Sequence, residues 1–182
     1  MKQKILVVVD MQNDFVDGSL GTKEAESIVS SVCEKINEAR TKEKAMVFAT
    51  KDTHTVNYLE TREGRFLPVK HCIKGTEGWQ INNKVAEALG DAAIIEKYSF
   101  GSLSLPDVIA EELQIRGIAP KDAEIELIGL CTDICVISNA LILKARFPET
   151  DICADASCCA GVTTEKHLAA LETMRSCQIE II

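Results

Sequence analysis

Short, almost uninterrupted apolar runs alternate along the chain with longer stretches in which apolar residues recur every three or four positions. The short runs have the length and composition of strands that are covered on both faces of a sheet. The longer stretches have the period of helices with one buried face. The short runs predict strands at residues 5–9, 45–50, 93–96, 124–128, 151–154 and 179–182.

The longer stretches predict helices between these strands. Thr22 is placed to cap a helix over residues 23–43, and Gly117 is placed to end a helix over residues 105–116. Strand–helix alternation of this kind favours a parallel sheet with helices on both faces, and no linker or internal repeat divides residues 1–182, so we expect one α/β domain. The predicted helices are 23–43, 81–89, 105–116, 134–145 and 164–176.

Composition narrows the classes of function. The chain has 182 residues, 46% of them apolar, and a formal net charge of −8, so nucleic acid and anionic membranes are poor partners. The apolar start MKQKILVVVDMQNDF is interrupted by an aspartate, and we interpret it as a first strand rather than a signal peptide. The eight cysteines form no small-domain disulfide framework, so we expect reduced thiols in a cytoplasmic protein.

Polar residues that follow the strands are the first candidates for chemistry, because parallel sheets bind ligands beyond the carboxyl ends of their strands. Asp10 ends the first run, Lys97 the third, and Cys135 follows the fourth in the segment GLCTDICV. Taken alone, Asp10 is more simply a structural cap and Lys97 a solvated surface residue. Their convergence at one edge of the sheet makes a joint catalytic role the better interpretation.

The segment GLCTDICV contains two cysteines with different prospects. Cys135 would lie in the first turn of a helix, where free N–H groups and the helix dipole favour a thiolate. A nearby lysine would add to this effect, and a carboxylate could take the thiol proton. Cys131 precedes the helix, and its backbone N–H, with that of Cys135, could form an oxyanion hole.

A second candidate site follows the second strand. Asp52 and His54 alternate along an extended segment, and His71 lies further along the irregular stretch 51–78. One carboxylate and two imidazoles suit Zn²⁺, Fe²⁺ or Mn²⁺ with coordination positions left open. Either histidine alone would more simply be a polar surface residue, whereas the D-x-H pair at a strand end favours a metal. We expect His167, in a helical pattern, at the surface.

These motifs together resemble the isochorismatase-like cysteine hydrolases, and most of all their nicotinamidase branch. They are DMQNDF at 10–15, DTH at 52–54, PVKHCIKGTEG at 68–78, KYSF at 97–100 and GLCTDICV at 129–136. The resemblance spans nearly the whole chain, in the expected order. It implies a mainly parallel, six-stranded, Rossmann-like three-layer α/β/α fold without the glycine-rich nucleotide loop, and hence no nucleotide cofactor.

The resemblance also implies roles for residues. Asp10, Lys97 and Cys135 match a catalytic triad, and the Leu130–Cys131 peptide matches a cis bond at the oxyanion hole. Phe15 and Leu130 match substrate-binding positions. Asp52, His54 and His71 match the ligands of one divalent metal ion, zinc by preference, and Glu60 falls near the position of a further ligand in some members. The implied activity is hydrolysis of nicotinamide in NAD salvage. The resemblance also implies that the enzyme is a homo-oligomer and that its binding partner is its small-molecule amide substrate.

One departure leaves alternatives open. Related nicotinamidases carry a bulky aromatic residue in W-P-x-H or F-P-x-H, whereas this chain has Leu67 before the proline and one extra residue. The substrate could therefore be another small amide, a carbamoyl or ureido compound, or isochorismate, although the metal ligands disfavour the last. A non-catalytic zinc or redox module, with Cys131 paired to Cys135, is disfavoured by the C-x-x-x-C spacing.

Overall fold

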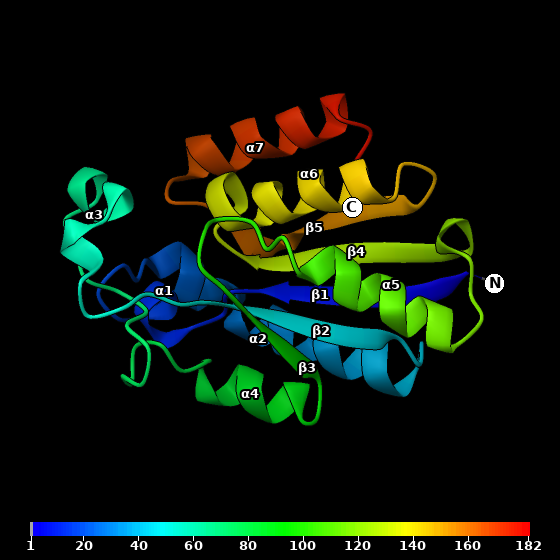
Figure 1. The fold of residues 1–182 in the computed structure, drawn as a ribbon, viewed down its shortest axis with the longest axis horizontal. Coiled ribbons are helices and arrows are strands. Elements are labelled where there is room, and N and C mark those ends of the chain that lie inside the picture. Colours follow the sequence, from blue (N-terminus) through cyan, green and yellow to red (C-terminus); the bar gives the residue numbers. More distant parts are fainter. Residues whose placement is uncertain (1) are drawn as a thin grey trace.

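A computed structural model describes residues 2–182, and its centre is a six-stranded sheet in which every pairing is parallel (Figure 1). The order of the strands across the sheet is β3-β2-β1-β4-β5-β6. The expected mainly parallel α/β architecture is thus confirmed. The strands are β1 (Gln3–Val9), β2 (Met46–Asp52), β3 (Ala93–Lys97), β4 (Ala123–Leu130), β5 (Asp151–Ala160) and β6 (Glu180–Ile181).

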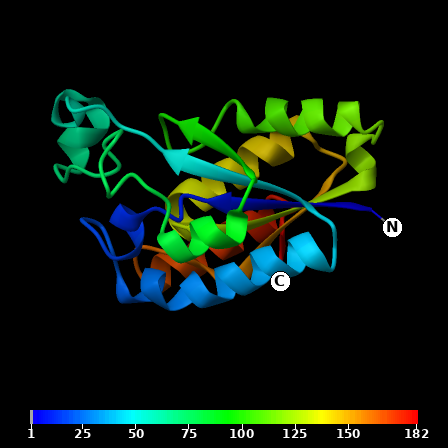
Figure 2. The ribbon, with the colours of Figure 1, turned by 90° about the horizontal axis from the view of Figure 1, so that it is seen from below.

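Helices cover both faces of the sheet, which Figure 2 shows edge-on. One face packs against α5 (Leu105–Ile115), α6 (Ile137–Arg146) and α7 (Thr164–Ser176). The other packs against α2 (Lys23–Thr41) and α4 (Asn83–Leu89). The shorter elements are α1 (Asn13–Val16), α3 (Arg62–Phe66), the 3₁₀ turns Tyr58–Glu60 and Pro120–Asp122, and a π-helical turn, Thr132–Val136.

The apolar side chains on both faces of β1 explain why helices cover both faces of the sheet. Successive side chains of a strand point to opposite faces. Val7 and Val9 enter the core beneath α5, α6 and α7, whereas Leu6 and Val8 enter the core beneath α2 and α4. Both faces of the strand therefore need apolar residues, and this is why the run that predicted it is continuously apolar.

Two predicted elements differ from the observed ones. Strand β5 continues to Ala160 rather than ending at 154, because a salt bridge from Lys35 of α2 and a hydrogen bond from Ser157 satisfy the polar Asp155 inside it. The helix expected at 134–145 begins as the π-helical turn Thr132–Val136 and becomes α-helical only at Ile137. The stretch 51–78 is not featureless, since it contains α3 and a 3₁₀ turn.

The order of the strands places a ligand site at the centre of one edge. The chain moves from β1 outward to β2 and β3, and then returns to add β4 on the other side of β1. Ligands in such sheets bind where the order reverses, beyond the carboxyl ends of the strands. Here that point lies between the ends of β1 and β4. No helix within residues 2–182 is both long and apolar enough to cross a membrane.

Candidate active site

Asp10, Lys97 and Cys135 meet at the reversal point of the sheet. Asp10 directly follows β1, Lys97 is the last residue of β3, and Cys135 lies in the π-helical turn after β4. The Lys97 ammonium is 2.7 Å from Asp10 Oδ2 and 3.5 Å from Cys135 Sγ. The three residues are 0–5% exposed, so their charges interact outside bulk water. The structure therefore brings together the triad that the strand ends predicted.

Asp10 is held in place from two sides. Its carboxylate accepts a hydrogen bond of 2.7 Å from Thr50 Oγ1 and pairs with Lys97 through its other oxygen. Its backbone has a φ of +47°, a left-handed conformation that aspartate adopts more readily than most residues. Burial raises the pKa of Asp10 above its ordinary value, although the Lys97 charge opposes this. The raised pKa makes Asp10 a better proton acceptor than an exposed aspartate.

Lys97 connects the triad to the candidate metal ligands. Besides Asp10, its ammonium contacts Asp52 Oδ1 at 3.0 Å and the Ser99 carbonyl at 3.1 Å. Burial alone would lower its pKa, but the charges of Asp10, Cys135 and Asp52 outweigh burial and raise the pKa above its ordinary value. Lys97 therefore stays protonated and supplies a fixed positive charge beside the thiol.

Cys135 is a thiol that needs a base. Burial, with the Asp10 charge in second place, raises the pKa of Cys135 well above its ordinary value, and Lys97 only partly opposes this. In this surrounding the protonated thiol is therefore favoured over the thiolate. The preceding peptide, Leu130–Cys131, is cis, as the resemblance implied. All eight cysteines are free, so Cys131 and Cys135 do not form a disulfide.

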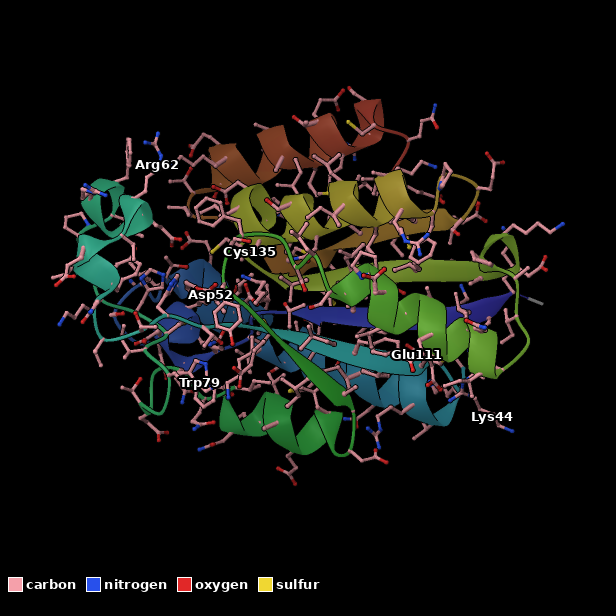
Figure 3. The ribbon with its side chains drawn as sticks, in the orientation of Figure 1. Lys44, Asp52, Arg62, Trp79, Glu111 and Cys135 are labelled. Atoms are coloured by element: carbon pink, nitrogen blue, oxygen red, sulfur yellow. The ribbon has the colours of Figure 1, made fainter. Side chains whose placement is uncertain are left out.

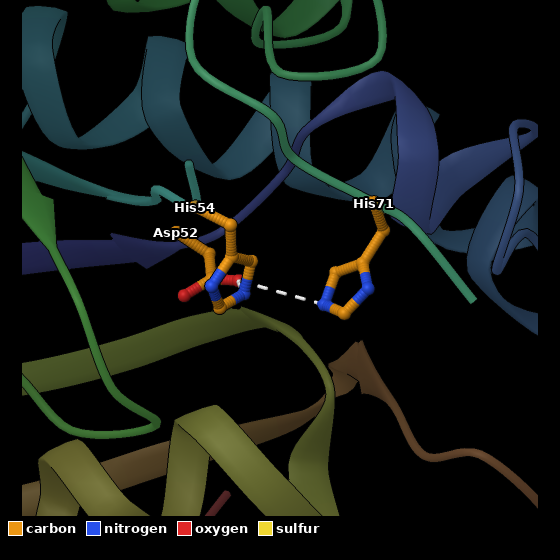
Figure 4. Close-up of side chains that lie close together, drawn as sticks. All are labelled: Asp52, His54 and His71. Carbon is orange, nitrogen blue, oxygen red and sulfur yellow. Dashed lines mark ion pairs between the residues drawn. The ribbon is translucent and has the colours of Figure 1, made fainter. Parts of the chain in front are cut away.

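Asp52, His54 and His71 form a second buried cluster, drawn in Figure 4. Their ligand atoms all lie within 4.8 Å of one another. Asp52 Oδ2 is 2.7 Å from His54 Nε2 and 3.7 Å from His71 Nε2. His71 Nδ1 lies 2.9 Å from the Val69 carbonyl, an arrangement that in metal sites fixes the ring and leaves Nε2 for the ion.

The donor set fits a divalent metal ion. His54 Nε2 is buried and has no well-aligned hydrogen bond within residues 2–182, although Asp52 Oδ2 lies only 2.7 Å away. A buried nitrogen without an aligned partner, close to a carboxylate oxygen, fits a place where both atoms face an ion. Burial opposes ionisation of Asp52, but His54 and Lys97 outweigh it and hold the pKa of that carboxyl below its ordinary value. An ionised carboxylate beside two imidazoles is a ligand set that zinc, iron and manganese accept.

Glu63, rather than Glu60, is the additional carboxylate at this cluster. Glu63 Oε1 lies 3.6 Å from His54 Nε2 and 3.8 Å from His71 Nε2. Glu60 is exposed at the end of a 3₁₀ turn and lies outside the cluster. The difference arises because Thr61 separates the two residues: it ends the 3₁₀ turn and caps α3, whose first turn contains Glu63.

A cavity of about 260 Å³ opens onto both clusters. In Figure 3, Asp52 and Cys135 lie at the end of the sheet toward which the strands point, far from Lys44 and Glu111 at the other end. The wall of the cavity is largely apolar, as in sites for small organic ligands. The lining includes Phe15, Leu20, Leu67, Phe100, Ile134 and Val162, with Asp52, Glu63, His71, Cys131, Cys135, Thr22 and Lys166.

The two predicted substrate contacts fare differently. Phe15 lines the cavity and tilts against His71, with ring centroids 5.5 Å apart. Leu130 does not line it, because the alternation of β4 buries this side chain completely in the core under α2 and α4. Cys131 also forms part of the cavity wall.

Gln12 is a supporting residue that the sequence did not reveal. Its side-chain amide is fully buried and bonds to both sides of the Asp52 backbone, accepting from the N–H at 2.7 Å and donating to the carbonyl at 2.8 Å. It also donates to the Trp79 carbonyl at 2.9 Å. Its place two residues after Asp10, in DMQNDF, is the only sequence signal for this role.

Comparison with known proteins gives a consistent result. The isochorismatase domain model matches residues 4–182. The Mycobacterium tuberculosis nicotinamidase/pyrazinamidase is 26% identical over 190 residues, which cover 98% of each chain. A zinc complex of Pyrococcus horikoshii pyrazinamidase matches with 28% identity and a TM-score of 0.82, covering 99% of this chain and 98% of that one.

A further solved structure supports the same assignment. The pyrazinamidase/nicotinamidase of Streptococcus mutans is 25% identical, with a TM-score of 0.83 over 99% of this chain and 100% of that one. The match of the domain model over nearly the whole chain and the shared fold agree with the geometry of the site. The chain is a hydrolase that belongs to the isochorismatase domain family.

Proposed function

We propose that this protein is a metal-dependent cysteine amidohydrolase whose substrate is nicotinamide, which it converts to nicotinate and ammonia in NAD salvage. The observation that carries this proposal is the position of Lys97. One buried ammonium contacts the candidate base Asp10, the candidate nucleophile Cys135 and the candidate metal ligand Asp52. A site for breaking an amide and a site for holding a ring thus share one cavity wall.

The first half of the reaction would consume the thiol proton. Asp10 takes the proton from Cys135 Sγ, and Lys97 stabilises the thiolate. The sulfur attacks the amide carbonyl carbon, forming a C–S bond. Backbone N–H groups of Cys131 and Cys135 would hold the resulting oxyanion. Asp10 then gives its proton to the departing nitrogen, the C–N bond breaks, and ammonia leaves a thioester behind.

The second half would regenerate the thiol. Asp10, now ionised again, takes a proton from a water molecule that attacks the thioester carbonyl. The C–S bond breaks, the acid is released, and Asp10 returns the proton to Cys135. The neighbouring Lys97 keeps Asp10 from remaining protonated at rest, because its ammonium is 2.7 Å from the carboxylate.

The substrate assignment rests on the second cluster. Asp52, His54 and His71, with Glu63 nearby, would hold a divalent ion, zinc by preference, whose charge would bind a pyridine nitrogen and so orient the ring. Phe15, which lies against His71, would pack on one face of that ring. The named activity of the Mycobacterium tuberculosis relative and the zinc in the Pyrococcus horikoshii structure support this proposal.

A different small amide is the second candidate, and one observation favours it. Leu67 lines the cavity where related nicotinamidases carry an aromatic residue, and it is held there because its carbonyl accepts a hydrogen bond of 3.0 Å from the Tyr58 hydroxyl. An aliphatic wall restricts a flat ring less than an aromatic one. Carbamoyl and ureido amides would then share the same triad.

Ammonia release by purified, metal-loaded protein tests the proposal. We expect rapid release from nicotinamide, none from Cys135→Ala, and normal release from Cys177→Ala, whose thiol lies at the far end of α7. Release that survives Cys135→Ala would overturn the mechanism. If the wild-type protein releases ammonia only from a carbamoyl or ureido compound, the triad stands and nicotinamide is excluded.

A further inference from the structure

Two consecutive side chains of the turn that carries Cys135 bond to α7 and to the segment just before it. Thr132 Oγ1 lies 2.8 Å from His167 Nδ1, and Asp133 Oδ1 accepts a hydrogen bond of 2.9 Å from the Val162 N–H. Thr132 and Asp133 are therefore two residues of GLCTDICV that attach the turn to α7 and to the segment before it.

The hydrogen bond between Thr132 and His167 matters because the Thr132 hydroxyl has no other hydrogen-bond partner among the described residues. Thr132 is 0% exposed, and within residues 2–182 its hydroxyl has no other side-chain or backbone partner. A buried hydroxyl that loses its partner pays its full desolvation cost. Burial lowers the pKa of His167, although Asp133 opposes this, so the ring is neutral near pH 7 and its Nδ1 can accept the Thr132 hydroxyl hydrogen.

The junction between β5 and α7 leaves little room for the turn to shift. A Cβ at Gly161 would lie 2.8 Å from Asp133 Oδ1 and 2.9 Å from the His167 backbone nitrogen. Thr163 caps α7, and its carbonyl accepts the His167 N–H at 2.9 Å. His167 is thus held in the first turn of α7, and it is half-buried rather than at the surface, where its helical pattern had placed it.

The same junction contributes to the cavity. Val162 and Lys166 line it from the side of α7, and Ile134 and Cys135 line it from the side of the turn. The Thr132–His167 bond connects these two sides. A displacement of the turn relative to α7 would therefore move the Cys135 thiol and, at the same time, change the width of the cavity.

We propose that His167 is a positioning residue that, through Thr132, fixes the thiol of Cys135 and the α7 wall of the substrate cavity in one arrangement. This inference rests on the proposed role of Cys135 as the nucleophile. His167 itself touches neither the substrate nor the thiol. Its effect is one of alignment, and misalignment of about 1 Å in an active site can cost roughly 100-fold in rate.

The test removes the acceptor and then restores it. His167→Leu lacks the ring nitrogen, whereas in His167→Asn the side-chain oxygen is as many bonds from Cα as Nδ1 is in histidine. The matched control is Leu168→Ala, the next residue on α7, which is 58% exposed and does not line the cavity. Alkylation of Cys135 by iodoacetamide, followed peptide by peptide with mass spectrometry, reads out the thiol without any substrate.

We expect His167→Leu to change the Cys135 alkylation rate and to lower kcat by about tenfold to 100-fold, with bound zinc unchanged. His167→Asn should recover most of both, and Leu168→Ala should match the wild type. Should His167→Leu fail to fold, Thr132→Val with Thr132→Ser as its rescue tests the same bond from the other side.

The outcomes separate this inference from the proposed function. Equal alkylation rates in the wild type and His167→Leu, or no recovery in His167→Asn, overturn the role of His167 whatever the substrate is. The opposite result is also informative. If the wild-type protein leaves nicotinamide intact, but the alkylation rate changes in His167→Leu and recovers in His167→Asn, nicotinamide is excluded as the substrate and the positioning role of His167 is supported.

Discussion

The ammonium of Lys97 lies between two buried carboxylates, 2.7 Å from Asp10 Oδ2 and 3.0 Å from Asp52 Oδ1. Lys97 reaches these partners from β3, an edge strand, by extending past the end of β2 toward β1. This single charge therefore compensates one carboxylate proposed to transfer a proton and one proposed to bind a metal. The charge state of each carboxylate therefore depends on the Lys97 ammonium.

Replacing Lys97 by methionine should damage both chemistry and stability. Two buried carboxylates would lose their counter-charge, and breaking a buried ion pair costs about 3–5 kcal/mol of unfolding free energy. Asp10 would then hold a proton and cease to act as a base, so we expect turnover to fall at least about 100-fold. Urea unfolding and steady-state ammonia release measure the two effects.

Lys74→Met is the matched control for Lys97→Met. Lys74 pairs with Glu96 at the surface, where its side chain is 57% exposed, and such pairs contribute little to stability. Normal turnover in Lys97→Met would show that the ammonium is only a structural counter-ion.

Much of the fold was predictable because β1, β2 and β4 are covered on both faces. A continuous apolar run such as 5–9 fits few structures besides a strand covered in this way, and the rule for strand ends then located Asp10, Lys97 and Cys135. What escaped prediction depends on contacts between distant segments. The end of β5 was missed because Asp155 is polar in sequence and satisfied only by Lys35 of α2.

The errors at the site have local physical causes. Glu60 and Glu63 are equivalent in the sequence, and only the cap that Thr61 places on Gly64 makes α3 begin between them. Leu130 follows the strand alternation of β4, which buries its side chain away from the cavity. Short turns and caps of this kind leave no periodic signal, so sequence patterns cannot orient their side chains.

Glu63 gives a prediction about metal affinity. Its carboxylate lies 3.6 Å and 3.8 Å from the two Nε2 atoms of His54 and His71, close enough to join or support their ligand set. Glu63→Gln removes the charge at nearly constant shape and should weaken zinc binding by about 10-fold to 100-fold. Titration of the metal-free protein with zinc, against a competing chelator, measures the change.

Glu60→Gln serves as the control, since it makes the same substitution on the exposed residue three positions earlier. Its zinc affinity should equal that of the wild type. Equal losses in the two variants would mean that general negative charge, and not the place of Glu63, determines affinity.

Asp155 predicts a pH dependence of stability away from the site. Its carboxylate lies 2.8 Å from Lys35 Nζ, which also contacts Glu126 at 2.8 Å. Burial opposes ionisation, but the bonds from Lys35 and Ser157 outweigh it and hold the pKa of Asp155 below its ordinary value. The stabilisation is therefore complete above the unfolded pKa, about 3.9, and is lost as the pH falls through the lower folded pKa.

Asp155→Asn should accordingly be less stable than the wild type at pH 7, and the difference should shrink below about pH 4. Urea unfolding of both proteins at pH 7, 5 and 3 measures that difference, and other carboxylates cancel because they are common to both. A difference that is the same at every pH would mean that Asp155 acts through shape or hydrogen bonding alone.

Gly129 predicts how closely β4 must approach β1 to build the site. It has a φ of +116°, and a Cβ there would lie 2.2 Å from the Val9 carbonyl oxygen. Gly129 precedes the Leu130–Cys131 peptide, so any shift of β4 away from Val9 would also move the turn that carries Cys135. Gly129→Ala should therefore lose both stability and turnover.

Gly75→Ala separates the two causes of that loss. Gly75 also has a positive φ, +87°, but a Cβ there meets nothing within 4 Å. Its substitution should cost only the backbone strain, about 1–2 kcal/mol of unfolding free energy, because an L-residue resists this conformation. Gly129→Ala adds a backbone collision to similar strain, and we expect at least about 2 kcal/mol more. Equal costs in urea unfolding would show that the contact between Gly129 and Val9 relaxes freely and that close packing of β1 and β4 does not position the cysteine.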